Sequence, residues 1–179
     1  ALLLAPRCGA LVLVARRVDR LTQLAASLQA SHPGLRVEVE GCDLCDLGAV
    51  ERLAEAMRSR HGAVDLLVNN AGLGDIGLFE VSDPQKNVEM VQVNILAPTV
   101  LPRALLPEML RRDRGAILNI SSGFGLTWMP AAAAYAGTKH YMTAWSESLR
   151  CELAGTAVCL TQVCPGPVRT EFESVAGNP

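Results

Sequence analysis

The chain has 179 residues, half of them hydrophobic, and a formal net charge of −2. This length suits one hydrophobic core, so we expect a single domain over residues 1–179. The small net charge excludes a strong electrostatic footprint for nucleic acid or for an anionic membrane surface. No apolar run reaches the roughly 18 residues of a membrane span, although an anchor or signal upstream of Ala1 stays open.

The first half of the chain alternates strand and helix patterns. Apolar residues at 10–15 predict a strand, and residues 18–30 and 47–60 carry apolar side chains on one helical face. Such alternation is typical of a parallel sheet with crossover helices. Two interpretations of the start stay open: residues 1–5 form a hairpin with the first strand, or they form a short frayed helix, since Pro6 disfavours a helix interior.

Three later apolar runs each end in small or polar residues. Residues 64–68 lead into Asn69, residues 115–120 lead to Ser122, and residues 157–163 break at Pro165-Gly166. We expect buried parallel strands whose carboxyl ends open onto loops, which is where ligands bind in open α/β sheets.

Two helical stretches accompany these strands. Residues 84–112 include Pro98, Pro102 and Pro107, and an interior proline costs roughly 3 kcal/mol, so this helix must kink or break. A second helix is expected over residues 131–153.

The second helix carries Tyr135 and Lys139, four residues apart. Residues at this spacing share a helix face, and a neighbouring ammonium favours the phenolate, so we expect Lys139 to lower the pKa of Tyr135. Such a phenol exchanges protons near neutral pH. The alternative is an ordinary polar pair on a helix surface.

Five motifs, in order, resemble those of the short-chain dehydrogenase/reductase family. They are Asn69-Asn70-Ala71-Gly72, Asn94, Ser122 thirteen positions before Tyr135, Tyr135-x-x-x-Lys139, and Pro165-Gly166-x-Val168-x-Thr170. The similarity extends from about Ala10 onward. It implies an α/β fold with a doubly wound, mostly parallel, Rossmann-like sheet.

The resemblance also implies the roles of the site residues. Tyr135 passes the proton to or from the substrate oxygen, which Ser122 holds, and Lys139 holds the nicotinamide ribose. Asn94 anchors a water leading toward Lys139. Asn94, Ser122, Tyr135 and Lys139 are therefore the expected catalytic residues. The expected cofactor-binding residues are Arg16, Arg17, Asp43, Leu44, Asn70, Ala71, Gly72, Tyr135, Lys139, Pro165, Gly166, Val168 and Thr170.

Cofactor preference follows from the end of the first strand. Ala15 stands where an acid would bind the ribose 2′-hydroxyl, and Arg16 and Arg17 follow it. Guanidinium groups bind phosphate in a bidentate, charge-assisted way, so NADP(H) is favoured over NAD(H). The alternative is two solvated arginines at a strand end. Asp43 fits the acid beside the adenine ring, and it equally suits the N-terminus of the following helix.

The chain departs from the family pattern at both ends. It has no strand and glycine-rich turn to receive the pyrophosphate, and few residues follow Thr170. The lost strand would lie between those carrying Ala15 and Asn69, so two ladders would be exposed. We therefore expect a truncated sheet, incomplete at the first strand and at the C-terminus.

These observations favour an NADP(H)-dependent oxidoreductase that interconverts a secondary alcohol and a ketone or aldehyde, as a carbonyl reductase does. A truncated, non-catalytic remnant is the rival interpretation, and an NAD(H)-dependent hydroxyacyl dehydrogenase is the third. Expected partners are a small carbonyl or alcohol substrate, possibly lipid- or steroid-like, and a second copy of the chain. The resemblance implies a dimer formed through the helices that contain Asn94 and Tyr135.

Six cysteines without paired small-domain spacing suggest free thiols in a reducing, cytoplasm-like compartment. Cys42 and Cys45 form a C-x-x-C pair, and with Cys159 and Cys164 they offer a weak zinc alternative. We expect no metal, because Cys159 and Cys164 lie along one strand and its exit.

Overall fold

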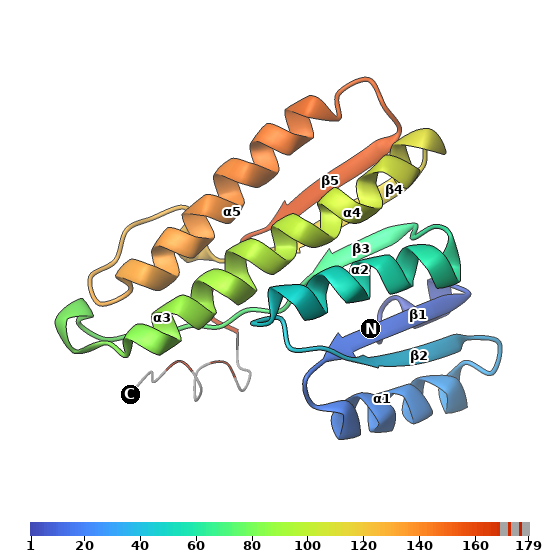
Figure 1. The fold of residues 1–179 in the computed structure, drawn as a ribbon, viewed down its shortest axis with the longest axis horizontal. Coiled ribbons are helices and arrows are strands. Elements are labelled where there is room, and N and C mark those ends of the chain that lie inside the picture. Colours follow the sequence, from blue (N-terminus) through green and yellow to red (C-terminus); the bar gives the residue numbers. More distant parts are fainter. Residues whose placement is uncertain (169–171, 173–175, 177–179) are drawn as a thin grey trace.

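Strands and helices alternate along the chain, as the sequence predicted. The computed structural model describes residues 1–168 together with Phe172 and Ala176. The strands are β1 (Ala10–Ala15), β2 (Arg36–Gly41), β3 (Leu66–Asn69), β4 (Gly115–Ile120) and β5 (Val158–Val163). The helices are α1 (Val18–Ser31), α2 (Leu47–His61), α3 (Pro84–Val91), α4 (Ala97–Arg111) and α5 (Ala133–Glu152) (Figure 1). None of the helices in the described part of the chain is long and apolar enough to cross a bilayer.

Local signals fix several of these ends. The Asp46 side chain accepts a hydrogen bond from the Ala49 amide, which caps the start of α2. Gly62 ends that helix with φ of 66°, a conformation that glycine adopts without steric cost. Asp83 caps α3 in the same way, by accepting from the Gln85 amide at 2.8 Å.

The sheet is divided into two parallel parts. β1 pairs with β2, and β4 lies between β3 and β5. Within the described residues, no ladder joins β1 to β3, so each of these strands has one unpaired edge. The prediction of a missing strand at this position is confirmed.

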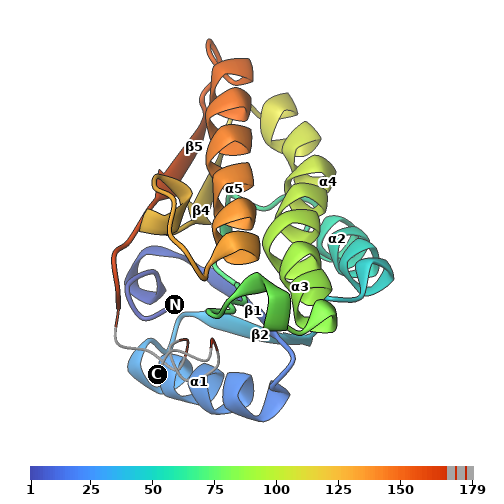
Figure 2. The same ribbon diagram turned by 90° about the vertical axis from the view of Figure 1, so that its left-hand side faces the viewer.

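One hydrophobic cluster holds the two parts of the sheet together. It packs α2, α4 and α5 against the strands and includes Leu53, Leu105 and Ile117. Val12 of β1 and Leu67 of β3 both lie against it, so the same core covers both parts. Figure 2 shows α2, α4 and α5 on one side of the strands, with α1 on the other side of β1 and β2.

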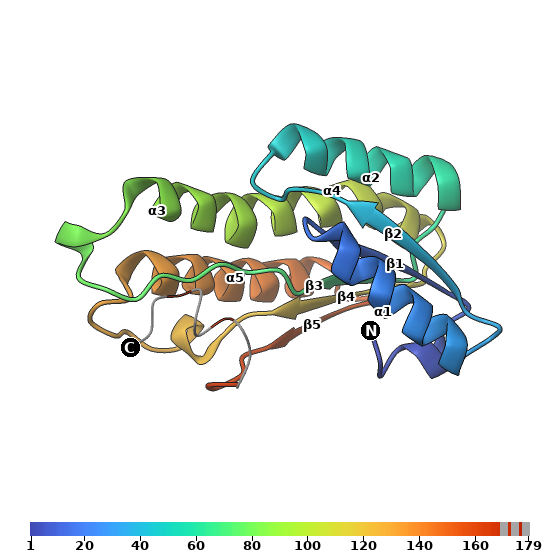
Figure 3. The same cartoon turned by 90° about the horizontal axis from the view of Figure 1, so that it is seen from below.

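A second, smaller cluster lies under α1. Leu28 of α1, Leu35 and Ala5 form it, with Leu11 and Leu13 of β1 packed against them. The helix therefore covers only the β1–β2 part of this face (Figure 3).

The opposite face of β3, β4 and β5 is partly open. Leu66 and Val68 are 37% and 36% exposed, and Val163 is 44% exposed. Along β5, buried and exposed residues alternate at first, as in a strand with one covered face. The expectation of fully buried strands was therefore wrong, because no described element covers this face.

The start of the chain is a short, irregular helix. The amides of Leu4 and Ala5 donate to the Ala1 carbonyl at 2.9 and 3.0 Å, and a 3₁₀ turn follows at Ala5–Arg7. The frayed-helix interpretation is confirmed and the hairpin interpretation is wrong.

The long helical stretch is interrupted, as its prolines predicted. A π-helical segment, Gln92–Leu96, separates α3 from α4. Pro98 has no N–H to donate to the Asn94 carbonyl four residues earlier, so the regular ladder fails here. Pro102 and Pro107 are both accommodated inside α4.

Candidate functional site

The carboxyl ends of β3, β4 and β5 meet the start of α5 at one end of the molecule, on the left in Figure 1. Ser122 follows β4, and Tyr135 is the third residue of α5. A hydrogen bond joins the Ser122 hydroxyl to the Tyr135 phenol, and both residues are buried. The structure thus brings together the two hydroxyls that the family resemblance assigned to the substrate oxygen.

The Tyr135 phenol is less acidic than an ordinary tyrosine. Burial raises its pKa, and the hydrogen bond from Ser122 offsets part of that rise. The expectation that Lys139 would lower this pKa was wrong for the free chain. The Lys139 ammonium lies 5.6 Å from the centre of the Tyr135 ring, and the loss of solvent around the phenol dominates.

Lys139 is buried, and few hydrogen bonds compensate its ammonium for the loss of water. Its side chain lies one turn beyond Tyr135, the residue is 6% exposed, and Nζ donates a long 3.4 Å hydrogen bond to the Ile120 carbonyl. Burial lowers the pKa of Lys139 to about 8, while nearby Cys164 acts in the opposite direction. A charge held this way gains from any further acceptor that enters the site.

Asn94 is a clamp between the loop after β3 and helix α5. Its Oδ1 accepts from the Leu73 amide at 2.8 Å, and its Nδ2 donates to the Leu73 carbonyl at 2.8 Å. Nδ2 also donates to Thr138 Oγ1 at 3.0 Å, which in turn donates to the Tyr135 carbonyl. The side chain is fully engaged, so an Asn94-bound water would have to use the backbone carbonyl that Pro98 leaves without its usual partner.

A network of hydrogen-bonded amide side chains links the strands next to the site to α5. It was not predicted from the sequence. Asn69 Nδ2 donates to Asn119 Oδ1 at 2.9 Å, and Asn119 Nδ2 donates to Ser146 Oγ at 2.9 Å. Asn119 and Ser146 are completely buried. The network ties β3 and β4 to α5, and the one sequence signal was an amide inside the apolar run of β4.

The expected cofactor residues after β3 lie at the mouth of the site. Asn70 and Ala71 are exposed, and Gly72 is half-buried. A Cβ on Gly72 would lie 3.5 Å from both Asn94 Oδ1 and Lys139 Nζ, so this backbone faces the buried ammonium.

The expected residues after β5 lie on the other side. The Pro165 carbonyl accepts from the Gly123 amide at 2.9 Å, which continues the pairing of β4 with β5. Gly166 follows in the loop, and Val168 is 56% exposed. Thr170 lies outside the described residues.

The expected adenosine-binding residues are at the ends of β1 and β2. Arg16 and Arg17 are exposed after β1. Asp43 Oδ1 accepts from the Cys45 amide at 3.0 Å, so it closes a turn, whereas Asp46 caps the helix. Leu44, in contrast, packs against the main hydrophobic cluster.

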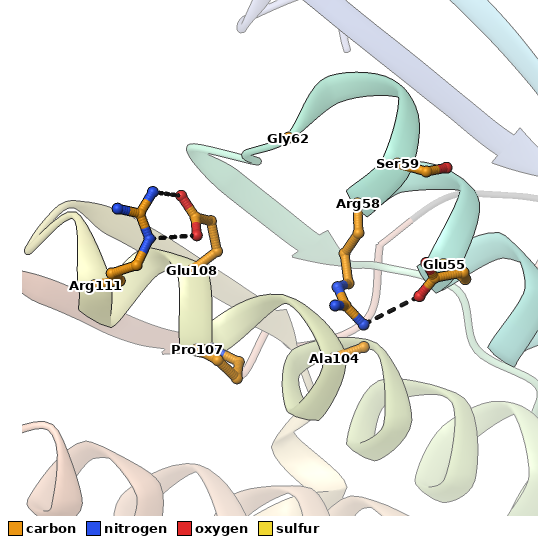
Figure 4. Close-up of a pocket in the computed structure, with 8 residues that line it drawn as sticks. All are labelled: Glu55, Arg58, Ser59, Gly62, Ala104, Pro107, Glu108 and Arg111. Atoms are coloured by element: carbon orange, nitrogen blue, oxygen red, sulfur yellow. Dashed lines mark hydrogen bonds and ion pairs between the residues drawn. The ribbon is translucent and has the colours of Figure 1, made fainter.

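A hollow of about 390 Å³ lies between α2 and α4, away from these residues (Figure 4). Arg58 pairs with Glu55 at 3.0 Å and Arg111 pairs with Glu108 at 2.6 Å, each within its own helix, so their charges are already neutralised. The lining residues are Glu55, Arg58, Ser59, Gly62, Ala104, Pro107, Glu108 and Arg111.

No cysteine belongs to a group of three or more potential metal ligands in the described part of the chain. All six are unpaired thiols, and burial raises the pKa values of Cys42 and Cys45, with Asp43 as the next contribution. Among residues 1–168, Phe172 and Ala176, no three His, Cys, Asp or Glu side chains gather where they could hold a metal ion.

Comparisons with known proteins agree with this arrangement. Dehydrogenase/reductase SDR family member 7B of Bos taurus is 34% identical over 167 residues, which are 90% of this chain and 51% of the bovine protein. D-beta-hydroxybutyrate dehydrogenase of Cupriavidus necator is 30% identical over 145 residues, which are 81% of this chain and 56% of that enzyme. The chain thus spans about half the length of the curated relatives it matches.

Solved structures match over nearly the whole chain. A metagenomic short-chain oxidoreductase in complex with NADP superposes with a TM-score of 0.85 at 34% identity, covering 93% of this chain and 74% of its own. A short-chain dehydrogenase/reductase from Burkholderia phymatum in complex with NAD gives 0.87 at 28% identity, covering 97% and 62%. The sequence profile of the short chain dehydrogenases matches residues 2–178. The protein therefore belongs to the short-chain dehydrogenase family, with a Rossmann-like α/β fold.

Proposed function

We propose that the chain is an NADP(H)-dependent oxidoreductase that interconverts a secondary alcohol and a ketone or aldehyde. The observation that carries the proposal is the hydrogen-bonded pair of buried hydroxyls, Ser122 and Tyr135, with the buried ammonium of Lys139 one helical turn away. These groups sit at the carboxyl ends of the strands, where an α/β sheet binds its ligands. The family supports oxidoreduction as the reaction class.

Ser122 binds the substrate oxygen, and Tyr135 exchanges a proton with it. The Phe124 amide donates to Ser122 Oγ at 3.3 Å. The Ser122 proton, which is donated to the Tyr135 phenol in the free chain, would be donated to a substrate oxygen that enters the site. Because its pKa is raised, Tyr135 is protonated at neutral pH and donates its proton when a carbonyl is reduced. A bound nicotinamide supplies the hydride for that reduction.

Lys139 stabilises the product of that proton transfer. With a pKa of about 8 it is mostly protonated at neutral pH, so it favours the Tyr135 phenolate left after the proton has gone. Its partner at 3.4 Å is a weak one, so ribose hydroxyls would satisfy the remaining N–H groups. The Asn94 carbonyl, which Pro98 leaves without its usual partner, would accept a hydrogen bond from a water.

The described residues suit the two ends of the dinucleotide better than the pyrophosphate between them. Lys139 and Tyr135 suit the nicotinamide ribose, and Arg16 and Arg17 suit a 2′-phosphate at the far end, where Asp43 would lie beside the adenine. The described residues place no glycine-rich turn between β1 and β3, so they provide no cradle for the pyrophosphate. We expect binding that is weaker than a complete cradle would give.

Cofactor titration tests the proposal. We expect the purified chain to raise nicotinamide fluorescence with NADPH at lower concentrations than with NADH. Arg16→Asp should reduce affinity for NADPH relative to NADH by about tenfold or more. The substitution replaces a guanidinium that would bind the 2′-phosphate with a carboxylate that repels it. Arg103→Asp, an equal charge change on α4, is the matched control. If Arg16→Asp leaves the ratio unchanged, the 2′-phosphate assignment is wrong.

A second candidate function rests on the divided sheet. Two unpaired strand edges, β1 and β3, are a cost that an active enzyme would be expected to avoid, so a non-catalytic remnant with a binding role is the rival. A cooperatively folded chain that binds neither NADPH nor NADH would favour the remnant. Tighter binding of NADH than of NADPH would favour an NAD(H)-dependent hydroxyacyl dehydrogenase.

We also propose a homodimer through the helices next to the site. Thr99 of α4 and Tyr141 of α5 are joined by a 3.1 Å hydrogen bond, and Leu96 and Tyr141 are partly exposed beside it. Sedimentation equilibrium of the purified chain tests this, with a single monomeric species as the contrary result.

A further inference from the structure

Six large apolar side chains are exposed on two loops beside the site. The loop after β3 carries Leu78, Phe79 and Val81, which are 59%, 67% and 77% exposed. The loop after β4 carries Leu126, Trp128 and Met129, which are 64%, 86% and 51% exposed. We name these six residues the apolar rim. Exposed apolar groups gathered in this number mark a surface that is covered in function.

The two loops that carry the rim are fixed to each other. The Gly77 amide donates to the Ala131 carbonyl at 2.8 Å, and Ala131 holds a left-handed φ of 62°. Trp128 stacks on His140 of α5, with ring centres 6.1 Å apart and planes 12° apart. The backbone hydrogen bond therefore ties the two loops together, and the ring contact fixes Trp128 on α5.

The base of the first loop is anchored as well. Lys86 of α3 pairs with Asp75 at 2.6 Å, and Asn94 holds both backbone groups of Leu73. An apolar ligand that binds here would meet a formed surface and would lose less affinity to ordering the loops.

The rim continues into the site. Leu126 lies four residues after Ser122, and Ala131 lies four residues before Tyr135. The Phe124 ring packs edge-on against Tyr135 at 5.6 Å between centres, and Phe172 packs against the same ring at 5.6 Å. Apolar surface therefore runs from the phenol outward to the two loops.

We propose that the apolar rim binds the hydrocarbon body of a bulky apolar ketone or secondary alcohol whose oxygen reaches Ser122 and Tyr135. This inference rests on the proposed function. Residues 126–131 carry no charged side chain, so a small hydroxy acid would find no ion partner on that loop. A rigid bicyclic ketone would cover the rim, and each ring that leaves water adds to its affinity.

The chain offers an internal reporter of this binding. Trp128 belongs to the rim, whereas Trp145 packs against the main core. Trp145→Phe therefore leaves Trp128 as the single tryptophan. We expect trans-2-decalone to shift its emission to the blue, saturably, and at concentrations at least tenfold below those needed with cyclohexanone.

A rim variant and a matched control locate the effect. Phe79→Ser, made in the Trp145→Phe background, should weaken decalone binding about tenfold, because the ketone loses one aromatic contact. Val88→Ser removes a similarly exposed apolar side chain from α3, outside the rim, and should leave the affinity within twofold. Equal effects of the two variants would overturn the proposal.

The test separates the rim from the proposed chemistry. If decalone binds as expected but NADPH does not reduce it, the rim stands and the proposed oxidoreductase function fails. If NADPH reduces cyclohexanone and decalone binds no better than cyclohexanone, the function stands and the rim proposal fails. If Trp128 emission shifts with protein concentration alone, a second copy covers the rim and the proposal is overturned.

Discussion

Replacing Lys139 with Met should stabilise the folded chain at neutral pH. Lys139 is 6% exposed, and its ammonium donates one long hydrogen bond, at 3.4 Å, to the Ile120 carbonyl. A buried charge with such a partner costs free energy that a methionine of similar length does not. In the proposed function this cost is retained because the charge stabilises the Tyr135 phenolate.

The magnitude follows from the pKa of Lys139. Folding lowers that pKa from 10.5 to about 8. Each pKa unit corresponds to about 1.36 kcal/mol, so the charged form costs about 3 kcal/mol in the folded state below pH 8. Between pH 8 and 10.5 the unfolded chain holds the extra proton, so the free energy of unfolding of the natural chain rises with pH across this window.

Urea unfolding of both proteins across pH 7 to 10.5 measures the effect. Lys139→Met should exceed the natural chain by about 3 kcal/mol at pH 7, and the difference should shrink toward zero near pH 10.5. Taking the difference between the two proteins cancels the contributions of groups that titrate alike in both. Lys86→Met, at the other lysine, is the control: it breaks the ion pair with Asp75, so it should not be more stable than the natural chain at pH 7. A flat difference for Lys139→Met, or a less stable variant at pH 7, would refute the reasoning.

Two further substitutions probe the scaffold of the site. Asn94→Ala removes three hydrogen bonds and should lower the free energy of unfolding by about 3 kcal/mol in urea, whereas Asn87→Ala, which loses one, should cost no more than about 1 kcal/mol. Equal losses would show that the clamp adds nothing. Val68→Lys places a charge on β3 beside its unpaired edge and should reduce light scattering after refolding, while Leu110→Lys on α4 should not. Unchanged scattering for Val68→Lys would mean that this edge does not drive association.

Much of the fold follows from local sequence patterns. Helices α1, α2 and α5 begin and end within two residues of the expected bounds, because caps such as Asp46 and Gly62 act over one turn. The break between α3 and α4 was expected, but its position was not. The divided sheet was also predicted, since the sequence has no strand to place between β1 and β3. The open face at Val163 was not, because the burial of a face depends on which distant elements cover it.

Some features of the site could also be predicted from the sequence, whereas others depend on residues that are far apart in the chain. The family resemblance implied that the hydroxyls of Ser122 and Tyr135 meet, because it assigns both to the substrate oxygen. The direction of the Tyr135 pKa was missed, because it depends on how much solvent the surrounding rings and loops remove. The Asn119 network was missed because it needs the register of β3 on β4 and the placement of Ser146 above them.

Single-turnover oxidation of NADPH by trans-2-decalone, measured for Tyr135→Phe, tests the central claim most directly. The chain has two tyrosines, so Tyr141→Phe is the matched control. We expect Tyr135→Phe to slow the reaction by roughly 10²- to 10⁴-fold while the control keeps the natural rate. A natural chain that binds NADPH without oxidising it, or a Tyr135→Phe variant as fast as the control, would contradict the account.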